Sequence, residues 1–100
     1  MLKKDLIELC LLHLLSQGDQ YGDDLLKKLR AAFPGTQESA VYALLRGLCR
    51  DGYLDQYTGA TSDGPARKYY RLTDHGMGRY SELFKQWRAF MDALAELGLK

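Results

Sequence analysis

Two segments of the chain carry side chains whose chemistry suits nucleic acid. In the first segment, polar residues that can hydrogen-bond base edges and phosphates recur at spacings close to those of one helix face: Gln37, Ser39, Tyr42 and Arg46. In the second segment, residues 65–80 contain four basic residues against one acidic residue, and Arg67 and Lys68 begin this basic run. Each of these residues alone is an ordinary surface residue. Only the combination favours DNA binding.

Other kinds of chemistry lack the residues that they need. The two cysteines, Cys10 and Cys49, stand in apolar stretches without a CxxC pair or a Cys/His cluster, so we expect buried free thiols and no metal. The sequence has no serine–histidine–aspartate set and no glycine-rich phosphate loop. The adjacent pairs Asp23-Asp24 and Asp74-His75 are interpreted as charges at helix N-termini rather than as catalytic groups. We therefore expect neither an enzyme nor a bound cofactor.

Length and charge narrow the possibilities further. A chain of 100 residues fits one domain, and it buries only about 60–65% of its unfolded surface, so a second copy often completes such a core. The net charge of +1 neither indicates nor excludes a polyanionic partner. The longest nearly apolar run, residues 9–15, is far shorter than the roughly 20 residues of a membrane span, so no membrane partner is expected. Free thiols favour a reducing, cytoplasmic location.

The elements that must position the polar residues follow from the spacing of the apolar ones. Helices are predicted over 2–17, from about 20 to 33 after a cap at Asp19, and from 36 or 37 to 51. Tyrosine-rich segments at 53–58 and 66–73 predict a β-hairpin.

A last helix, capped by Thr73, is predicted over 74–97. Its apolar positions 83, 87, 90, 94 and 97 alternate in steps of four and three, as in a coiled-coil seam. The first helix is apolar over most of its circumference, which indicates a second surface to cover, such as another subunit.

This order of elements predicts a mainly α fold with a small β-hairpin: a winged helix-turn-helix plus a C-terminal dimerisation helix. Residues 1–73 are expected to form the winged helix-turn-helix DNA-binding domain, and residues 74–100 the dimerisation helix, within a single compact unit. In such an arrangement the second helix of the turn enters the major groove, and the hairpin contacts flanking backbone.

Three stretches resemble the PadR family of transcriptional regulators: QGDQYGDDLL (17–26), VYALLRGLCRDGYL (41–54) and GPARKYYRLTDHG (64–76). Because one helix follows the wing, the chain is similar to the short subfamily that includes the lactococcal multidrug-resistance repressor. The resemblance implies a homodimer whose last helix packs on the partner's first helix, and repression by occupying an inverted-repeat operator in double-stranded DNA. The implied DNA contacts are Gln37, Ser39, Tyr42, Arg46, Arg67 and Lys68. One departure is Gly47, where the family commonly has a basic residue.

The resemblance also implies a ligand site at the dimer interface. Trp87, the only tryptophan, matches a tryptophan that pairs with its symmetry mate across a pore, where a planar aromatic or cationic small molecule stacks between the rings. The remaining ligand contacts would come from the first helix and the seam: Asp5, Glu8, Leu9, Leu12, His13 and Leu83. Alternatives stay open: Trp87 packs a core or an interface, His13 is structural, and the carboxylates are exposed at a rim.

The leading hypothesis is a homodimeric repressor that a small aromatic ligand releases from its operator. Such a ligand would change the spacing of two reading helices, which must match successive DNA turns about 34–36 Å apart. The alternative is a winged-helix protein-interaction module without DNA binding, motivated by Gly47 and the near-zero net charge.

Overall fold

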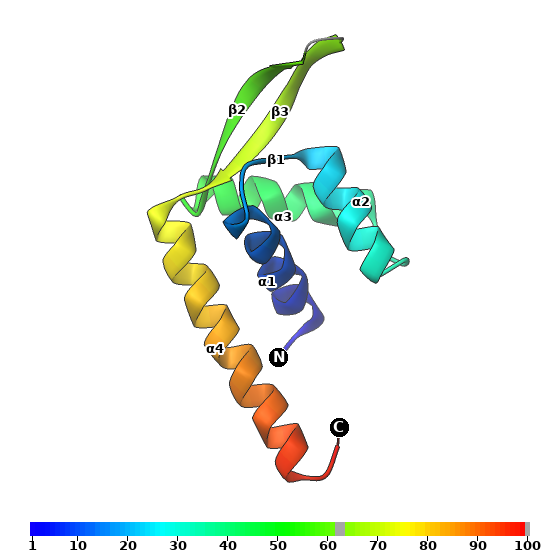
Figure 1. Ribbon diagram of the computed structural model, residues 1–100, viewed down its shortest axis with the longest axis vertical. Helices are drawn as coiled ribbons and strands as arrows, with labels where there is room; N and C mark the ends of the chain where they lie inside the picture. Colours follow the sequence, from blue (N-terminus) through cyan, green and yellow to red (C-terminus); the bar gives the residue numbers. More distant parts are fainter. Residues whose placement is uncertain (62–63, 100) are drawn as a thin grey trace.

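The computed structural model describes residues 1–61 and 64–99, which form four helices and a small sheet (Figure 1). Helices α1, α2 and α3 gather into a head, the sheet extends from one side of it, and α4 runs away from it on another (Figure 1). The fold class predicted from the sequence is confirmed, with one strand more than expected. In chain order the elements are α1 (Lys3–Ser16), β1 (Gln20–Tyr21), α2 (Gly22–Ala32), α3 (Glu38–Arg50), β2 (Leu54–Thr61), β3 (Gly64–Leu72) and α4 (Asp74–Glu96).

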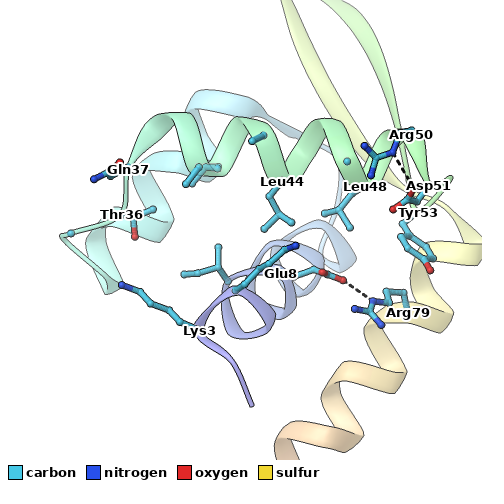
Figure 2. A pocket seen from close by; sticks show the side chains of 17 residues that line it. Lys3, Glu8, Thr36, Gln37, Leu44, Leu48, Arg50, Asp51, Tyr53 and Arg79 are labelled. Atoms are coloured by element: carbon cyan, nitrogen blue, oxygen red, sulfur yellow. Dashed lines mark hydrogen bonds and ion pairs between the residues drawn. The ribbon is translucent and has the colours of Figure 1, made fainter.

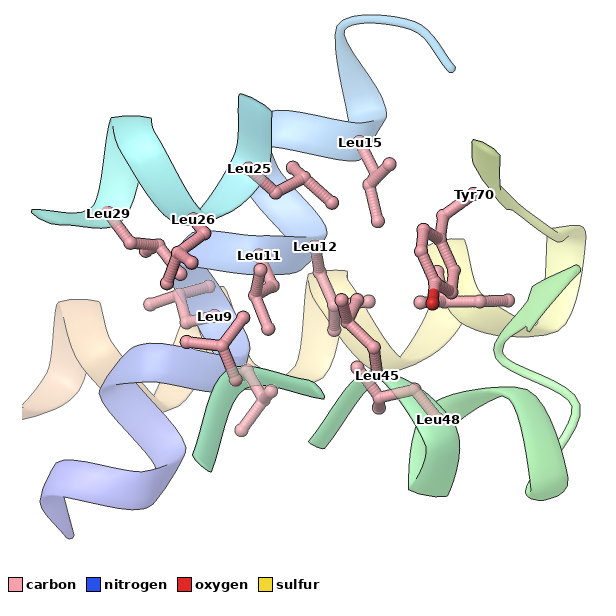
Figure 3. Packing of buried hydrophobic residues seen from close by; sticks show 13 residues of the cluster. Leu9, Leu11, Leu12, Leu15, Leu25, Leu26, Leu29, Leu45, Leu48 and Tyr70 are labelled. Carbon is pink, nitrogen blue, oxygen red and sulfur yellow. The ribbon is translucent and has the colours of Figure 1, made fainter. Parts of the chain in front are cut away.

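Buried leucines from every helix hold the head together (Figure 3). They recur at three- and four-residue spacings, which place them on the inward face of each helix. Burying a leucine contributes roughly 1.5–3 kcal/mol, so this cluster is the main stabilising feature of the fold. Its fully buried members include Leu11 and Leu12 of α1, Leu25 of α2, Leu45 of α3 and Leu83 of α4.

The sheet has three antiparallel strands in the order β1–β3–β2. Strands β2 and β3 form the predicted hairpin, which is the wing, and Tyr57 lies opposite Tyr69 in it. The added strand is β1, where Gln20 and Tyr21 pair with Tyr70 and Tyr69. A strand of two residues has no periodicity that the sequence could reveal.

The predicted start of the second helix at about residue 20, after a cap at Asp19, is wrong. The backbone of residues 20–21 is occupied by strand pairing, so α2 begins at Gly22. Asp19 instead accepts a hydrogen bond from the Tyr57 hydroxyl at 2.7 Å. This carboxylate therefore ties the wing to the turn before α2.

Helix α4 begins as predicted, because the Thr73 side chain accepts a hydrogen bond from the Gly76 backbone N–H (2.9 Å). Near its start it packs on α1 through the buried Leu83, whereas its far half leaves the head (Figure 1). Phe90 on that half and Leu97, which follows the helix, are 41% and 83% exposed. Within the described residues, no helix has the length and apolar character that crossing a bilayer requires.

The cysteines are free thiols, as predicted, but each is half-buried rather than buried. Burial raises the pKa of the Cys10 and Cys49 thiols above the usual value. A raised pKa keeps a thiol protonated, so both groups are poor nucleophiles.

Candidate functional site

Helix α3 carries most of the residues predicted to contact DNA bases. Ser39 and Arg46 are exposed on it. Gln37 is also exposed, but it is the N-cap residue and its side chain makes no capping hydrogen bond. Gln37 lines a groove between α3 and α1, on the side of α3 opposite Ser39 and Arg46, so the prediction that it shares one helix face with them is wrong (Figure 2).

Tyr42 differs from the exposed hydrogen-bonding residue that the sequence predicts. It is half-buried, and its hydroxyl donates a hydrogen bond to Oδ1 of Asp23 on α2 at 2.5 Å. A Cβ at Gly22 would lie 3.1 Å from the Tyr42 ring, so the glycine is what lets the ring reach α2. Burial, followed by the Asp23 hydrogen bond, raises the pKa of Tyr42 well above the usual tyrosine value. This side chain joins α3 to α2.

Asp23 has a second partner from a third element. The Tyr21 hydroxyl on β1 donates a hydrogen bond to its Oδ2 at 2.9 Å. The two hydrogen bonds, that of Tyr42 first, hold the pKa of the Asp23 carboxyl below its usual value. Above the Tyr21 ring lies Arg67 of β3, with its guanidinium carbon 4.8 Å from the ring centroid. Arg67, a predicted DNA contact of the wing, is therefore linked through Tyr21 to the carboxylate of Asp23, which is also bonded to α3.

The two basic residues predicted for the wing lie on opposite faces of β3, because side chains alternate along a strand. Both are exposed. Lys68 lies on the same face of β3 as Tyr70, which is buried in the core cluster with Leu45 and Leu48 of α3. Arg67 lies on the outer face with the Tyr69 ring, which stacks on Tyr57 at a centroid distance of 5.6 Å.

A mainly apolar pocket of about 440 Å³ lies between α1, α2 and α4. Three of the predicted ligand residues line it: Leu9, His13 and Trp87. The half-buried indole lies against Phe84 with ring centroids 5.6 Å apart. Nδ1 of His13 and the Tyr80 hydroxyl oxygen are 2.7 Å apart, so the imidazole is held by a partner on α4.

Several residues that line this pocket were not predicted from the sequence. Leu29 and Ala32 come from α2, which was not expected to contribute, and Phe33, the residue that follows α2, is 43% exposed. Half-buried Leu6 and Cys10 of α1 also line the pocket. Apolar residues left partly exposed on facing helices were the available signal.

The other predicted ligand residues do not line the pocket. Leu12 and Leu83 are 0% and 1% exposed inside the core, and Asp5 is half-buried in the first turn of α1. Glu8 is 6% exposed, and Arg79 Nε donates a hydrogen bond to its Oε2 at 2.7 Å. The expectation of a solvated Glu8 in a pore is therefore corrected, because an ion pair with α4 compensates the buried charge.

A second site, a groove of about 880 Å³, lies on another side of α1, between α1 and α3 (Figure 2). Ile7 and Leu44 contribute apolar surface to it, and the Glu8–Arg79 pair stands in one wall (Figure 2). Lys3 at the start of α1 adds positive charge at the rim. Gly47 also lines this groove, so the α3 position where a basic residue was expected faces α1 rather than the wing.

No set of three or more metal-ligating side chains comes together in the part of the chain that the structure describes. What the geometry does bring together is the exposed face of α3, a wing with cations on both faces, and an interhelical apolar pocket. A three-helix head followed by an antiparallel wing is the winged helix-turn-helix fold, in which a helix is presented to the DNA major groove.

The family model described as the transcriptional regulator PadR-like family matches residues 11–82, and the chain belongs to this family. The family is one of transcriptional regulators rather than enzymes. PadR regulators bind DNA.

Solved structures agree in fold over nearly the whole chain. A PadR-like transcriptional regulator from Bacillus cereus is 31% identical, with a TM-score of 0.84 over 92% of this chain and 90% of that one. A Streptococcus transcriptional regulator is 29% identical, with a TM-score of 0.87 over 95% and 94% of the two chains. An uncharacterised protein from Lysinibacillus sphaericus is 31% identical over 87% of this chain and 86% of its own length.

Proposed function

We propose that the chain is a homodimeric repressor that acts in the cytoplasm and occupies an inverted-repeat operator in double-stranded DNA. The observation that carries this proposal is the placement of exposed cations: Arg46 on α3, and Lys68 on the wing face that turns toward α3. Arg46 also lies near enough to Tyr70, on that same wing face, to lower its pKa against the larger raising effect of burial. Such a cluster can contact phosphates on both sides of a reading helix.

The exposed apolar face of α4 supports the dimer. Phe84, Phe90 and Met91 are each more than 40% exposed; Phe90 belongs to the predicted seam, and the other two are next to seam positions in the sequence. Asp92 and Glu96 stand on the same end of α4, whereas Lys3 stands at the rim of the groove beside α1. Apolar surface and opposite charges would both favour docking of residues 74–100 on the first helix of a partner. In this proposal, residues 1–73 form the DNA-binding unit of each subunit.

The pocket beside Trp87 supports a ligand-responsive repressor similar to the short PadR subfamily that includes the lactococcal multidrug-resistance repressor. Its walls are apolar and aromatic, and the volume of about 440 Å³ falls within the usual range of small-molecule sites. A planar aromatic or cationic compound would bind against Trp87, between α1 and α4. Binding would change the angle of α4 and hence the spacing of the two reading helices.

The alternative is a protein-interaction module without DNA binding, and the position of Gly47 no longer supports it. Gly47 lies in the groove beside α1. A basic residue at position 47 would therefore not lie on the face of α3 that carries Ser39 and Arg46, and its absence leaves the charge of that face unchanged. The near-zero net charge is the remaining motive, and the test below separates the two functions.

The DNA proposal is tested with duplexes that the wild-type protein selects from a random-sequence library. We expect affinity to fall steeply with salt, and each lost phosphate contact to lower the slope of the logarithmic plot by about 0.9. Arg67→Ala and Lys68→Ala should each weaken binding and flatten this slope. Lys85→Ala, on the exposed surface of α4, is the control and should do neither. Absent or salt-independent DNA binding, together with capture of a protein partner that survives both wing substitutions, would establish the interaction module instead.

The ligand proposal is tested by titrating ethidium, a planar aromatic cation, while following Trp87 emission. We expect saturable quenching, and weaker binding by calorimetry for Trp87→Leu. Calorimetry with the variant Lys85→Ala should match the wild type. If a broad panel of planar aromatics leaves the emission unchanged, Trp87 only packs the fold.

A further inference from the structure

The start of α2 is acidic although it adjoins the proposed DNA-binding elements. Asp19, Asp23 and Asp24 stand within six residues of one another. Carboxylates near phosphates oppose DNA binding, so general electrostatics would not favour them here. Two of the three accept hydrogen bonds from tyrosine hydroxyls of other elements, which indicates another role.

We infer that Asp23 is a positioning residue that locks the reading helix and the wing into one DNA-binding unit. This inference rests on the proposed DNA-binding function and deepens it. Asp23 would contact no DNA itself. It would act through Tyr42 on α3 and through Tyr21 beside the wing.

The contacts of Asp23 form a continuous path between the two DNA-binding elements. One carboxylate oxygen accepts the Tyr42 hydroxyl (2.5 Å), and the other accepts the Tyr21 hydroxyl (2.9 Å). Tyr21 pairs with Tyr69 on β3 and lies beneath Arg67. The path therefore runs from α3 through one carboxylate to β1 and on to the wing.

The path is strongest with a carboxylate, which can accept from both hydroxyls. Both hydroxyls donate, so the residue at 23 must accept twice, once at each oxygen. Hydrogen bonds to an ionised acceptor are about twice as strong as neutral ones. An asparagine has the same size and one acceptor oxygen, and its NH2 group cannot accept from the second tyrosine.

Asp24 is a matched control from the same helical turn. It carries the same charge, is exposed, and has no side-chain hydrogen bond among the residues that the structure describes. By electrostatics alone, removal of either charge should strengthen DNA binding slightly. A positioning role for Asp23 predicts the opposite sign at that position only.

The experiment compares Asp23→Asn with Asp24→Asn on a duplex that the wild type selects from a random-sequence library. We expect Asp23→Asn to weaken binding about tenfold, similar to the loss of one base contact, whereas Asp24→Asn leaves binding equal or tighter. The slope of affinity against salt should stay unchanged for Asp23→Asn, because no phosphate contact is removed. A merely structural role would lower the melting temperature without weakening the binding of protein that is still folded. Equal DNA affinities for the two variants overturn the inference.

A double-mutant cycle with Tyr42→Phe tests whether Asp23 acts through that hydroxyl. If it does, Asp23→Asn added to Tyr42→Phe should weaken DNA binding by less than about twofold more. Full additivity overturns the inference. The same cycle in urea unfolding, without DNA, should show coupling between the two residues. If the wild type binds no duplex while this coupling is present, the proposed DNA function fails and the positioning role fails with it. If the wild type binds and the coupling is absent, only the positioning role fails.

Discussion

Residue 76 lies so close to the backbone of Tyr53 that any β-carbon at position 76 would overlap the Tyr53 carbonyl oxygen. The same carbonyl accepts a hydrogen bond from the Thr73 hydroxyl at 3.0 Å. The turn between α3 and β2 and the start of α4 therefore meet at a backbone contact that only glycine permits. This contact sets the direction in which α4 leaves the head.

We predict opposite effects for the two glycines at the start of α4. Gly76→Ala should destabilise the fold by about 2–3 kcal/mol, because the obstacle is backbone and cannot rotate away. Gly78→Ala should stabilise it by roughly 0.5–1 kcal/mol, since no atom lies within 4 Å of an added β-carbon and alanine favours the helix. Urea unfolding of both variants measures the difference. Similar effects at the two positions would contradict the close approach at Gly76.

The Glu8–Arg79 pair should be important for stability. We expect Glu8→Ala to cost about 3 kcal/mol, because it leaves a partly buried guanidinium without its carboxylate. Asp51→Ala breaks the surface pair with Arg50 and should cost under about 1 kcal/mol, because the side chains of Arg50 and Asp51 are 78% and 51% exposed. Denaturant midpoints at neutral pH compare them. Equal costs for the two substitutions would show that burial of the first pair has no energetic consequence.

Stability should fall at both ends of the pH range, because Tyr42 is partly buried and its hydroxyl is hydrogen-bonded to Asp23. The pKa of Tyr42 is raised in the fold, so the folded state keeps a proton that the unfolded state loses, and stability falls as the pH rises above about 10. The pKa of Asp23 is lowered, so its contribution is lost as the pH falls below about 4. Unfolding curves at several pH values measure both losses. Tyr42→Phe should flatten the alkaline side, and an unchanged alkaline slope in that variant would contradict the assignment.

The apolar face of α4 should control oligomeric state. Phe90 is 41% exposed in a single chain, so Phe90→Asp should leave the head folded and shift a dimer to monomers. Ala89→Asp introduces the same charge at the neighbouring exposed position, outside the seam, and should leave the dimer intact. Sedimentation equilibrium gives the mass of each variant. A wild type that sediments as a monomer would contradict the dimer proposal.

Much of the architecture could be predicted because its signals are local. Leucine spacing predicts the three helices of the head, and the Thr73 cap predicts the start of α4. The exposed cations at 67 and 68 were visible as a run of charge. These features depend on neighbours within one or two turns of the chain.

The site could be predicted only in part because its key contacts are distant in sequence. Tyr42 and Asp23 are 19 residues apart, and Glu8 and Arg79 are 71 residues apart. The spacing of a polar residue along a helix is the same whether its side chain faces water or a distant partner. The helical pattern of α1 therefore placed Glu8 in a predicted ligand site, although an ion pair to α4 uses its charge.

The sequence by itself determined that this chain is a mainly helical protein with a wing, of the PadR type, because apolar spacing, turn residues and a family motif are written along the chain. Tertiary structure alone decided which polar groups remain available for binding. Packing of the four helices and the wing pairs Glu8 with Arg79 and Asp23 with the Tyr42 hydroxyl, whereas Ser39, Arg46 and the wing cations stay exposed. The physical reason is that a buried polar group must find a partner, and only the folded chain brings that partner within hydrogen-bond distance.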